Sequence, residues 1–300
     1  MVESLDQIKE RITQFQKEKP HYRDILDLYT QILAEQTKMQ SQLKITVPQV
    51  DQKLVQSQLN KGIPLLGIEG FALDLEAAQM LFYALSAIGK SATSKMEDEI
   101  PRITEEIESG NLNLEGLLSK HYDGHYITQE AEHCGVDKGV LSFLVQGSVR
   151  PSIVAQMEQL KDSLNLEEWL QGQCPICGSP PQIAQLRDEE GKRYLLCSLC
   201  GCQWRWERIA CPYCSNKDHK SLHYLYAEDE EAYRVDLCDL CKGYIKTIDS
   251  RKLGYDPYLD LEDVVTIHLD IIAMEKGYRR SAPTPWGPWP LLGEDALGSA

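Results

Sequence analysis

Four Cys-x-x-Cys pairs constrain this 300-residue chain more than any other feature, and they contain eight of its ten cysteines. The pairs are Cys174/Cys177, Cys197/Cys200, Cys211/Cys214 and Cys238/Cys241. Two thiolates at this spacing can bind one metal ion from a single tight turn. Two such turns supply the four sulfurs that a tetrahedral Zn²⁺ or a rubredoxin-like iron requires. The pattern therefore predicts two metal ions per chain, either Zn or Fe.

An internal repeat favours a sequential assignment of the pairs. Cys174-Pro-Ile-Cys-Gly is repeated as Cys211-Pro-Tyr-Cys-Ser, and Leu196-Cys-Ser-Leu-Cys-Gly as Leu237-Cys-Asp-Leu-Cys-Lys-Gly. We therefore expect one site formed by Cys174, Cys177, Cys197 and Cys200, and a second formed by Cys211, Cys214, Cys238 and Cys241. A cross-braced arrangement stays open, because spacing alone does not fix the pairing. Each Cys-x-x-Cys turn is called a knuckle below. Left-handed turns are expected at Gly178, Gly201 and Gly243, which closely follow the second cysteine of their knuckles.

The predicted sites have four chemical interpretations. Thioredoxin-type thiol catalysis is one, but it would need a pair that opens a helix in a βαβ unit. A closed four-thiolate site usually stabilises a small domain and performs no reaction. Iron in the same site could instead cycle between Fe(II) and Fe(III). Disulfides fit poorly, because the N-terminus, Met1-Val-Glu-Ser-Leu-Asp, has no secretory character and the thiols are grouped as ligand pairs. Cys134 and Cys202 lie outside the pairs and have no predicted role.

Apolar periodicity predicts helices on both sides of the cysteine-rich region. Ile8, Ile12 and Phe15 begin a series of stripes at helical spacing, and a last stripe from Ile153 is expected to start a helix after Pro151. Beyond the cysteines, one helix is expected from an Asp260 cap to Gly277. The expected fold is α + small β: an N-terminal all-helical domain (1–172), two tandem rubredoxin-like or zinc-ribbon modules (173–209 and 210–250), and a C-terminal helix with an extended Pro/Trp tail (251–300).

Charge and motifs narrow the classes of function. The net charge is −15, and no section of the chain is basic, which disfavours a zinc-ribbon nucleic-acid-binding protein. No apolar run is long enough to cross a bilayer, so a cytoplasmic protein without membrane insertion is expected. The P-loop and Gly-x-Gly-x-x-Gly patterns are absent, and no catalytic constellation is visible. We therefore expect a binding protein and not an enzyme, with a redox role left open.

The cysteine-rich region and the C-terminus resemble the FdhE-type formate dehydrogenase accessory proteins. The resemblance covers about residues 173–285, and the N-terminal half agrees only in length and helical character. This sequence departs from some members of that family at Gly201-Cys202 and in its Trp-rich tail. The matching residues are Cys197-Ser-Leu-Cys, Trp204, Arg208, Cys211, Cys214, Leu222-His-Tyr, Cys238, Cys241, Tyr244-Ile-Lys and Leu269-Asp-Ile-Ile-Ala-Met-Glu-Lys-Gly-Tyr-Arg-Arg-Ser.

The resemblance implies a cytoplasmic maturation factor with rubredoxin-like domains, and it matches all eight paired cysteines to the family's metal ligands. The implied partner is the catalytic subunit of formate dehydrogenase, a molybdenum- or tungsten-dependent enzyme. Two hypotheses follow: a protein that holds the immature subunit, or a redox-active iron protein that transfers electrons during maturation. Trp204, Arg208, Tyr244 and Lys246 are candidates for partner contact, with packing inside the ribbons as the alternative. The oligomeric state is not predicted.

Overall fold

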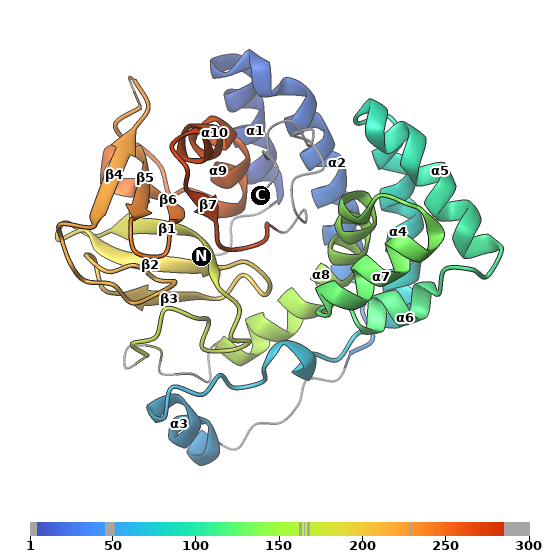
Figure 1. Cartoon of the computed structure of the whole chain (residues 1–300), viewed down its shortest axis with the longest axis horizontal. Helices are drawn as coiled ribbons and strands as arrows, with labels where there is room; N and C mark the ends of the chain where they lie inside the picture. Colours follow the sequence, from blue (N-terminus) through green and yellow to red (C-terminus); the bar gives the residue numbers. More distant parts are fainter. Residues whose placement is uncertain are drawn as a thin grey trace. The chain divides into compact units, whose positions relative to one another are not determined.

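The computed structural model describes residues 5–45, 52–161, 164, 166, 169–228 and 230–284 (Figure 1). These residues form two compact units. The first contains residues 5–45, 71–156 and 284, and the second contains the described parts of 52–70 and 157–283. The predicted tail residues Trp286 and Trp289 lie outside the described residues. Within the part that the structure describes, no helix is long and apolar enough to cross a membrane.

The first unit is helical, as the apolar spacing predicts. Five of its helices begin beside an Asp, Thr or Asn whose side chain accepts a hydrogen bond from a backbone N–H of the first turn (Asp74, Thr93, Asn113, Asp123 and Asp137). Such caps stabilise a helix by about 1 kcal/mol each. The helices are α1 (Leu5–Glu18), α2 (Arg23–Gln40), α4 (Leu75–Gly89), α5 (Ser94–Glu108), α6 (Leu114–Ser119), α7 (Gly124–Cys134) and α8 (Lys138–Lys161), with a 3₁₀ turn at Pro20–Tyr22. The last residues of α8, from Met157, are counted with the second unit.

The predicted helix start after Pro151 is wrong, because Pro151 lies inside the continuous helix α8. A proline inside a helix removes a backbone donor and costs about 3 kcal/mol. Val149 and Ile153, on either side of it, are fully buried. Burial of such apolar side chains contributes about 2 kcal/mol each and offsets that cost.

His121, between α6 and α7, gives the first unit a predicted pH dependence. Its ring is buried, its Nδ1 has no hydrogen-bond partner among the described residues, and burial lowers its pKa to about 4. Between about pH 6.5 and about pH 4, His121 takes up a proton in the unfolded state only, so the unfolding free energy should fall by about 3 kcal/mol.

Urea titrations across this pH range, on the wild-type chain and on His121→Phe, measure the effect. The variant should lose this part of the pH dependence. Equal pH slopes for the two proteins would show that His121 titrates alike in the folded and unfolded states.

The second unit is built on one seven-stranded sheet. Its strand order is β3-β2-β1-β6-β5-β4, with β7 paired to β6. Each four-cysteine module supplies three antiparallel strands, and parallel pairing of β1 with β6 joins the modules. The strands are β1 (Pro181–Arg187), β2 (Lys192–Cys197), β3 (Gln203–Trp206), β4 (Leu222–Tyr226), β5 (Tyr233–Cys238), β6 (Gly243–Asp249) and β7 (Arg279–Arg280).

The predicted C-terminal helix is two short helices, α9 (Leu259–Val264) and α10 (Ile267–Glu275). Asp260 does not cap α9; Tyr258 occupies the N-cap position, and the Asp260 carboxylate accepts a hydrogen bond from Gln182. Gly277 follows α10 with φ +82°, and the N–H of Tyr278 donates to the carbonyl of Ala273. The predicted stop at Gly277 is therefore confirmed. The unit also contains α3 (Gln52–Asn60) and 3₁₀ turns at Ile68–Gly70 and Ser250–Lys252.

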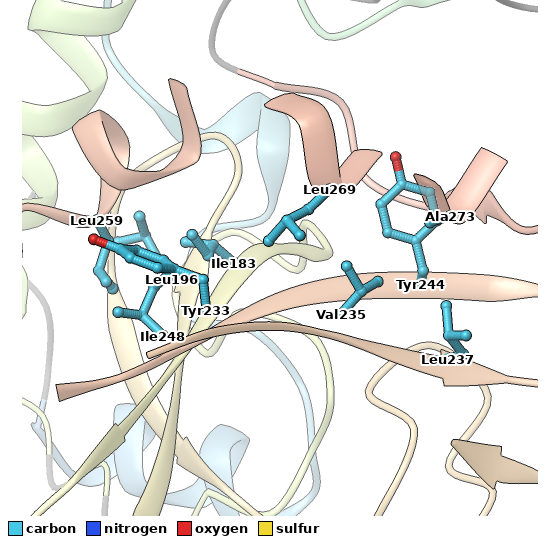
Figure 2. Close-up of a cluster of buried hydrophobic side chains, with 10 residues drawn as sticks. All are labelled: Ile183, Leu196, Tyr233, Val235, Leu237, Tyr244, Ile248, Leu259, Leu269 and Ala273. Carbon is cyan, nitrogen blue, oxygen red and sulfur yellow. The ribbon is translucent and has the colours of Figure 1, made fainter. Parts of the chain in front are cut away.

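Helices α9 and α10 cover one face of the sheet (Figure 2). Alternate strand residues point to this face because side chains in a strand have a period of two. The buried cluster contains Ile183, Leu196, Tyr233, Val235, Leu237, Tyr244, Ile248, Leu259, Leu269 and Ala273. The intervening residues of β2, β5 and β4, such as Arg193, Asp236 and Tyr224, belong to the opposite face. This core holds both cysteine modules in one rigid sheet.

Candidate functional site: two four-cysteine metal centres

The first module brings the thiols of Cys174, Cys177, Cys197 and Cys200 together. The Sγ atom of Cys177 lies 3.3 Å from that of Cys197 and 3.7 Å from that of Cys200. The Sγ atoms of Cys174 and Cys200 are 3.6 Å apart. All four side chains are buried. Cys197 is the last residue of β2, so the strand itself positions the second knuckle.

The second module groups Cys211, Cys214, Cys238 and Cys241 in the same way. The Sγ atoms of Cys211 and Cys241 are 3.7 Å apart, as are those of Cys214 and Cys238. Cys238 ends β5 as Cys197 ends β2. The predicted sequential pairing is therefore confirmed, and the cross-braced alternative is excluded.

Each knuckle turns through a left-handed residue directly after its second cysteine. These residues are Gly178, Gly201, Ser215 and Lys242, with φ between 56° and 78°. The expected left-handed turn at Gly243 is wrong, because Lys242 adopts that conformation instead. Space is tight at Gly243, since a Cβ there would lie 2.5 Å from the Ser281 Oγ, 3.2 Å from the Tyr213 ring and 3.3 Å from the Cys241 Sγ.

The sulfur positions fit a tetrahedral metal ion. A metal–sulfur bond of about 2.3 Å places tetrahedral sulfurs about 3.8 Å apart, close to the separations in both groups. Backbone N–H groups of Ile176 and Leu199 point at the Sγ atoms of Cys174 and Cys197, each at 3.4 Å. Hydrogen bonds of this kind stabilise thiolate charge around a bound cation. Both groups can therefore hold Zn²⁺ or iron, and each would supply all four ligands.

A bound cation would stabilise the thiolate forms of the first group. Burial raises the pKa of the Cys174, Cys197 and Cys200 thiols well above the ordinary value for cysteine. Four thiolates at this depth would repel one another without a positive ion. A divalent metal reverses this balance, since a coordinating thiol loses its proton. Metal binding would therefore be coupled to the folding of this module.

Residues 64–67 cover the first knuckle. The N–H groups of Leu65 and Leu66 donate to the carbonyls of Pro175 and Ile176, both at 2.9 Å, and the Pro64 ring packs against Gly178. This segment falls in the range that the apolar spacing predicts to be helical, and no metal-ligand motif marks it. In the second group, by contrast, the Cys214 and Cys241 side chains reach solvent.

This difference in exposure predicts that the second site releases its metal first. A chelator reaches a metal through an open face, and the first group has none. Adding a chromogenic chelator to the metal-loaded chain should give two phases of equal amplitude. In Cys211→Ser the fast phase should be absent while the slow phase remains. A single phase in the wild-type chain, or loss of the slow phase in this variant, would contradict the assignment.

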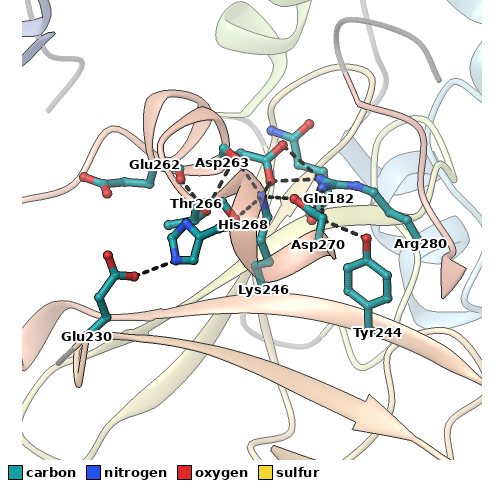
Figure 3. Close-up of polar contacts among 10 residues, drawn as sticks. All are labelled: Gln182, Glu230, Tyr244, Lys246, Glu262, Asp263, Thr266, His268, Asp270 and Arg280. Atoms are coloured by element: carbon teal, nitrogen blue, oxygen red, sulfur yellow. Dashed lines mark hydrogen bonds and ion pairs between the residues drawn. The ribbon is translucent and has the colours of Figure 1, made fainter. Parts of the chain in front are cut away.

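A buried ionic cluster attaches α9, α10 and β7 to the sheet (Figure 3). Lys246 on β6 is 0% exposed, and its Nζ lies 2.8 Å from Asp263 and 2.6 Å from Asp270. Arg280 pairs with the same two carboxylates at 2.9 and 2.7 Å, and the Tyr244 hydroxyl donates to Asp270. The cluster gives Asp270 and Arg280 of the C-terminal motif a structural role. Periodicity could not reveal it, because its members are distant in sequence.

The four candidate partner-contact residues separate into two groups. Trp204, Tyr244 and Lys246 are buried within the second unit, and the Trp204 Nε1 donates to the carbonyl of Gln171 at 3.0 Å. Their burial favours the packing alternative. Arg208 is exposed, with a hydrogen bond to the carbonyl of Glu190. Of the unassigned thiols, Cys202 is buried outside the ligand group and Cys134 lies at the end of α7.

The sheet and its two closed thiol groups define a tandem four-cysteine metal-ribbon protein. Two family models match this region: the FdhE central domain over residues 173–208 and the FdhE C-terminal domain over 209–286. An FdhE homolog of Aquifex aeolicus is 29% identical over 89% of this chain and 90% of that protein. An FdhE homolog of Haemophilus influenzae (strain PittEE) is 30% identical over 67% of each chain.

The chain belongs to the FdhE family, the family of formate dehydrogenase accessory proteins that its motifs resemble. Its fold is that of the crystal structure of the FdhE protein from Pseudomonas aeruginosa, with a TM-score of 0.63, 22% sequence identity and 93% coverage of each chain. The α + small β architecture predicted from the sequence is thereby confirmed.

Proposed function

We propose that this chain is an accessory protein for formate dehydrogenase that binds the immature catalytic subunit in the cytoplasm and catalyses no reaction itself. The observation that carries the proposal is the closed chemistry of the two thiol groups in a chain of this family. Four cysteines fill all positions of a tetrahedral ion, whereas catalytic metal sites keep one position open. Such centres shape a binding surface without offering a place for substrate.

The metals would act mainly as structural elements of that surface. The first group is buried, and knuckles from both modules extend directly from strands of the shared sheet. Metal binding would then order the sheet that presents the partner-binding residues. The reduced thiols of these sites fit the cytoplasm. The net charge of −15 argues against nucleic acid as the partner.

A redox role at the second site is the alternative. Cys214 and Cys241 reach solvent, and electron transfer requires such an accessible edge. Iron at this site would give thiolate charge-transfer bands that bleach on reduction. With zinc at both sites, the structural role would be the only one, because Zn²⁺ has no redox chemistry.

Capture and complementation together test the proposal. The chain is expressed in a formate dehydrogenase-producing bacterium that lacks its own accessory protein. Formate dehydrogenase activity should return, and the tagged chain should co-purify with the catalytic subunit before cofactor assembly is complete. Absence of both capture and restored activity would show that the proposed partner is wrong.

A further inference from the structure

A pocket of about 480 Å³ lies in the second unit, on the sheet face opposite α9 and α10. Its floor is formed by β4, β5 and β6, and the loop that precedes Cys211 forms a wall. Tyr224 and Tyr226 on β4 pair with Asp236 and Arg234 on β5 and line the pocket together. A volume of this size accommodates several side chains of a bound polypeptide or a small ligand.

The pocket is cationic although the chain is strongly acidic. Two carboxylates, Asp236 and Asp249, accompany five basic side chains: Arg193, Arg208, Arg234, Arg251 and Lys252. Arg251 pairs with Asp249 at 2.7 Å. Cations gathered in a concave site favour an anionic ligand.

Two guanidinium groups share one carboxylate at the base of the pocket. Asp236 lies 3.1 Å from the Nη2 of Arg193 and 2.9 Å from the Nε of Arg234. Arg193 is almost completely buried, and its own Nε has no hydrogen-bond partner among the described residues. A buried guanidinium requires more hydrogen-bond acceptors than this one carboxylate and the Ala210 carbonyl provide. Two guanidinium groups with one carboxylate leave the base of the pocket with a net positive charge.

The rim of the pocket is aromatic and apolar. Ile209 is 66% exposed, Tyr224 60% and Tyr226 46%. Arg234 lies over the Tyr224 ring at 5.4 Å and Lys252 over the Tyr226 ring at 5.8 Å. Tyrosine and arginine dominate the binding energy of protein interfaces. An inorganic anion would make no use of these side chains.

Strand β4 ends the sheet, and in the described part of the chain it pairs with β5 alone (Figure 1). The backbone groups along its outer side can therefore pair with an added strand. This backbone edge adjoins the aromatic rim. Single-stranded nucleic acid also binds cationic aromatic grooves. Here, however, four of the basic side chains already have carboxylate partners: Arg193, Arg234, Arg251 and Lys252. Such a pocket suits one or two ligand carboxylates better than a run of phosphates.

We propose that this pocket binds an extended segment of a partner polypeptide that carries a carboxylate beside an aromatic or large apolar side chain. The carboxylate pairs with the basic side chains of the pocket, of which Arg208 and Lys252 are exposed, the apolar group packs on Ile209 and the two tyrosines, and the backbone pairs with β4. The identity of the partner rests on the proposed function: the segment belongs to the catalytic subunit of formate dehydrogenase.

Charge reversal at exposed lining residues tests this site in the metal-loaded full chain. The variants are Arg208→Glu combined with Lys252→Glu, and separately Tyr224→Ala. Arg205→Glu is the matched control, because Arg205 is exposed on β3 and outside the pocket. The probes are the purified catalytic subunit, a random copolymer of glutamate and tyrosine, and an oligothymidylate. Metal content of each variant confirms folding.

The copolymer should bind the wild-type chain and the control alike and bind both pocket variants about tenfold or more weakly. The catalytic subunit should follow the same order. Equal copolymer binding by wild-type and pocket variants, no copolymer binding at all, or pocket-dependent binding of oligothymidylate alone would overturn the proposal. Pocket-dependent copolymer binding without binding of the catalytic subunit would support the site and reject the proposed partner.

Discussion

Replacing Cys177 with serine should remove the metal from the first site and unfold the ribbon around it. The Cys177 thiol lies within 3.7 Å of both Cys197 and Cys200, and no solvent can take its place at this buried position. Binding of a structural zinc ion contributes about 10–16 kcal/mol in small domains, and that free energy is folding free energy. Metal content should fall from two ions to one per chain, with loss of protection from proteolysis around β1 and β2.

Cys202→Ser is the matched control for this prediction. Cys202 is also buried and is two residues from a ligand, but its thiol lies outside the group of four. This variant should keep two metal ions and a wild-type proteolysis pattern. A Cys177→Ser chain with two metal ions, or a Cys202→Ser chain with one, would reject the ligand assignment.

Replacing Asp270 with asparagine should destabilise the second unit by about 3–5 kcal/mol. Asp270 pairs with Lys246 at 2.6 Å and with Arg280 at 2.7 Å; Asp270 and Lys246 are fully buried, and the Arg280 side chain is 10% exposed. Removing its charge leaves two buried cations with Asp263 as their carboxylate partner, and an uncompensated buried charge carries a penalty of this size. Chemical unfolding followed by the fluorescence of the second unit's tryptophans measures the loss.

Glu231→Gln provides the comparison, because Glu231 pairs with Lys252 at the surface and its side chain is 86% exposed. An exposed pair of this kind contributes at most about 1 kcal/mol. A loss below that value for Asp270→Asn would show that the cluster is not a main support of the sheet.

The pH dependence of the cluster has a defined sign. Burial opposes ionisation of Asp263, but Arg280 and Lys246 outweigh it and lower the pKa of this carboxyl below its ordinary value. Because the folded pKa is lowered, the stabilisation is present above the ordinary aspartate pKa and is lost as the pH falls through the folded pKa.

Local sequence patterns predicted the metal groups because each pair of thiols is contained in one short turn. The repeat of Cys-Pro-x-Cys and Leu-Cys-x-Leu-Cys then indicated which turns combine, and the structure groups them accordingly. Apolar stripes at helical spacing similarly carried the prediction of the first unit. Each of these patterns involves residues that are close together in the sequence, so it can be recognised from the sequence alone.

The shared sheet could not be predicted in the same way. The parallel pairing of β1 with β6 joins residues such as Ile183 and Lys246 that no short-range pattern relates. The cover of the first knuckle by residues 64–67 is equally distant in sequence. The sequence left Lys246 open between partner contact and packing inside the ribbon, and only the positions of Asp263 and Asp270 explain its burial.

Metal stoichiometry with a visible spectrum, on the full chain purified without oxygen, tests the central claim most directly. We expect two metal ions per chain. If they are colourless zinc ions, both sites are structural. Iron with charge-transfer bands that bleach on reduction would assign a redox role to the site that holds it. Less than one metal ion per chain would contradict the assignment of the eight cysteines as ligands.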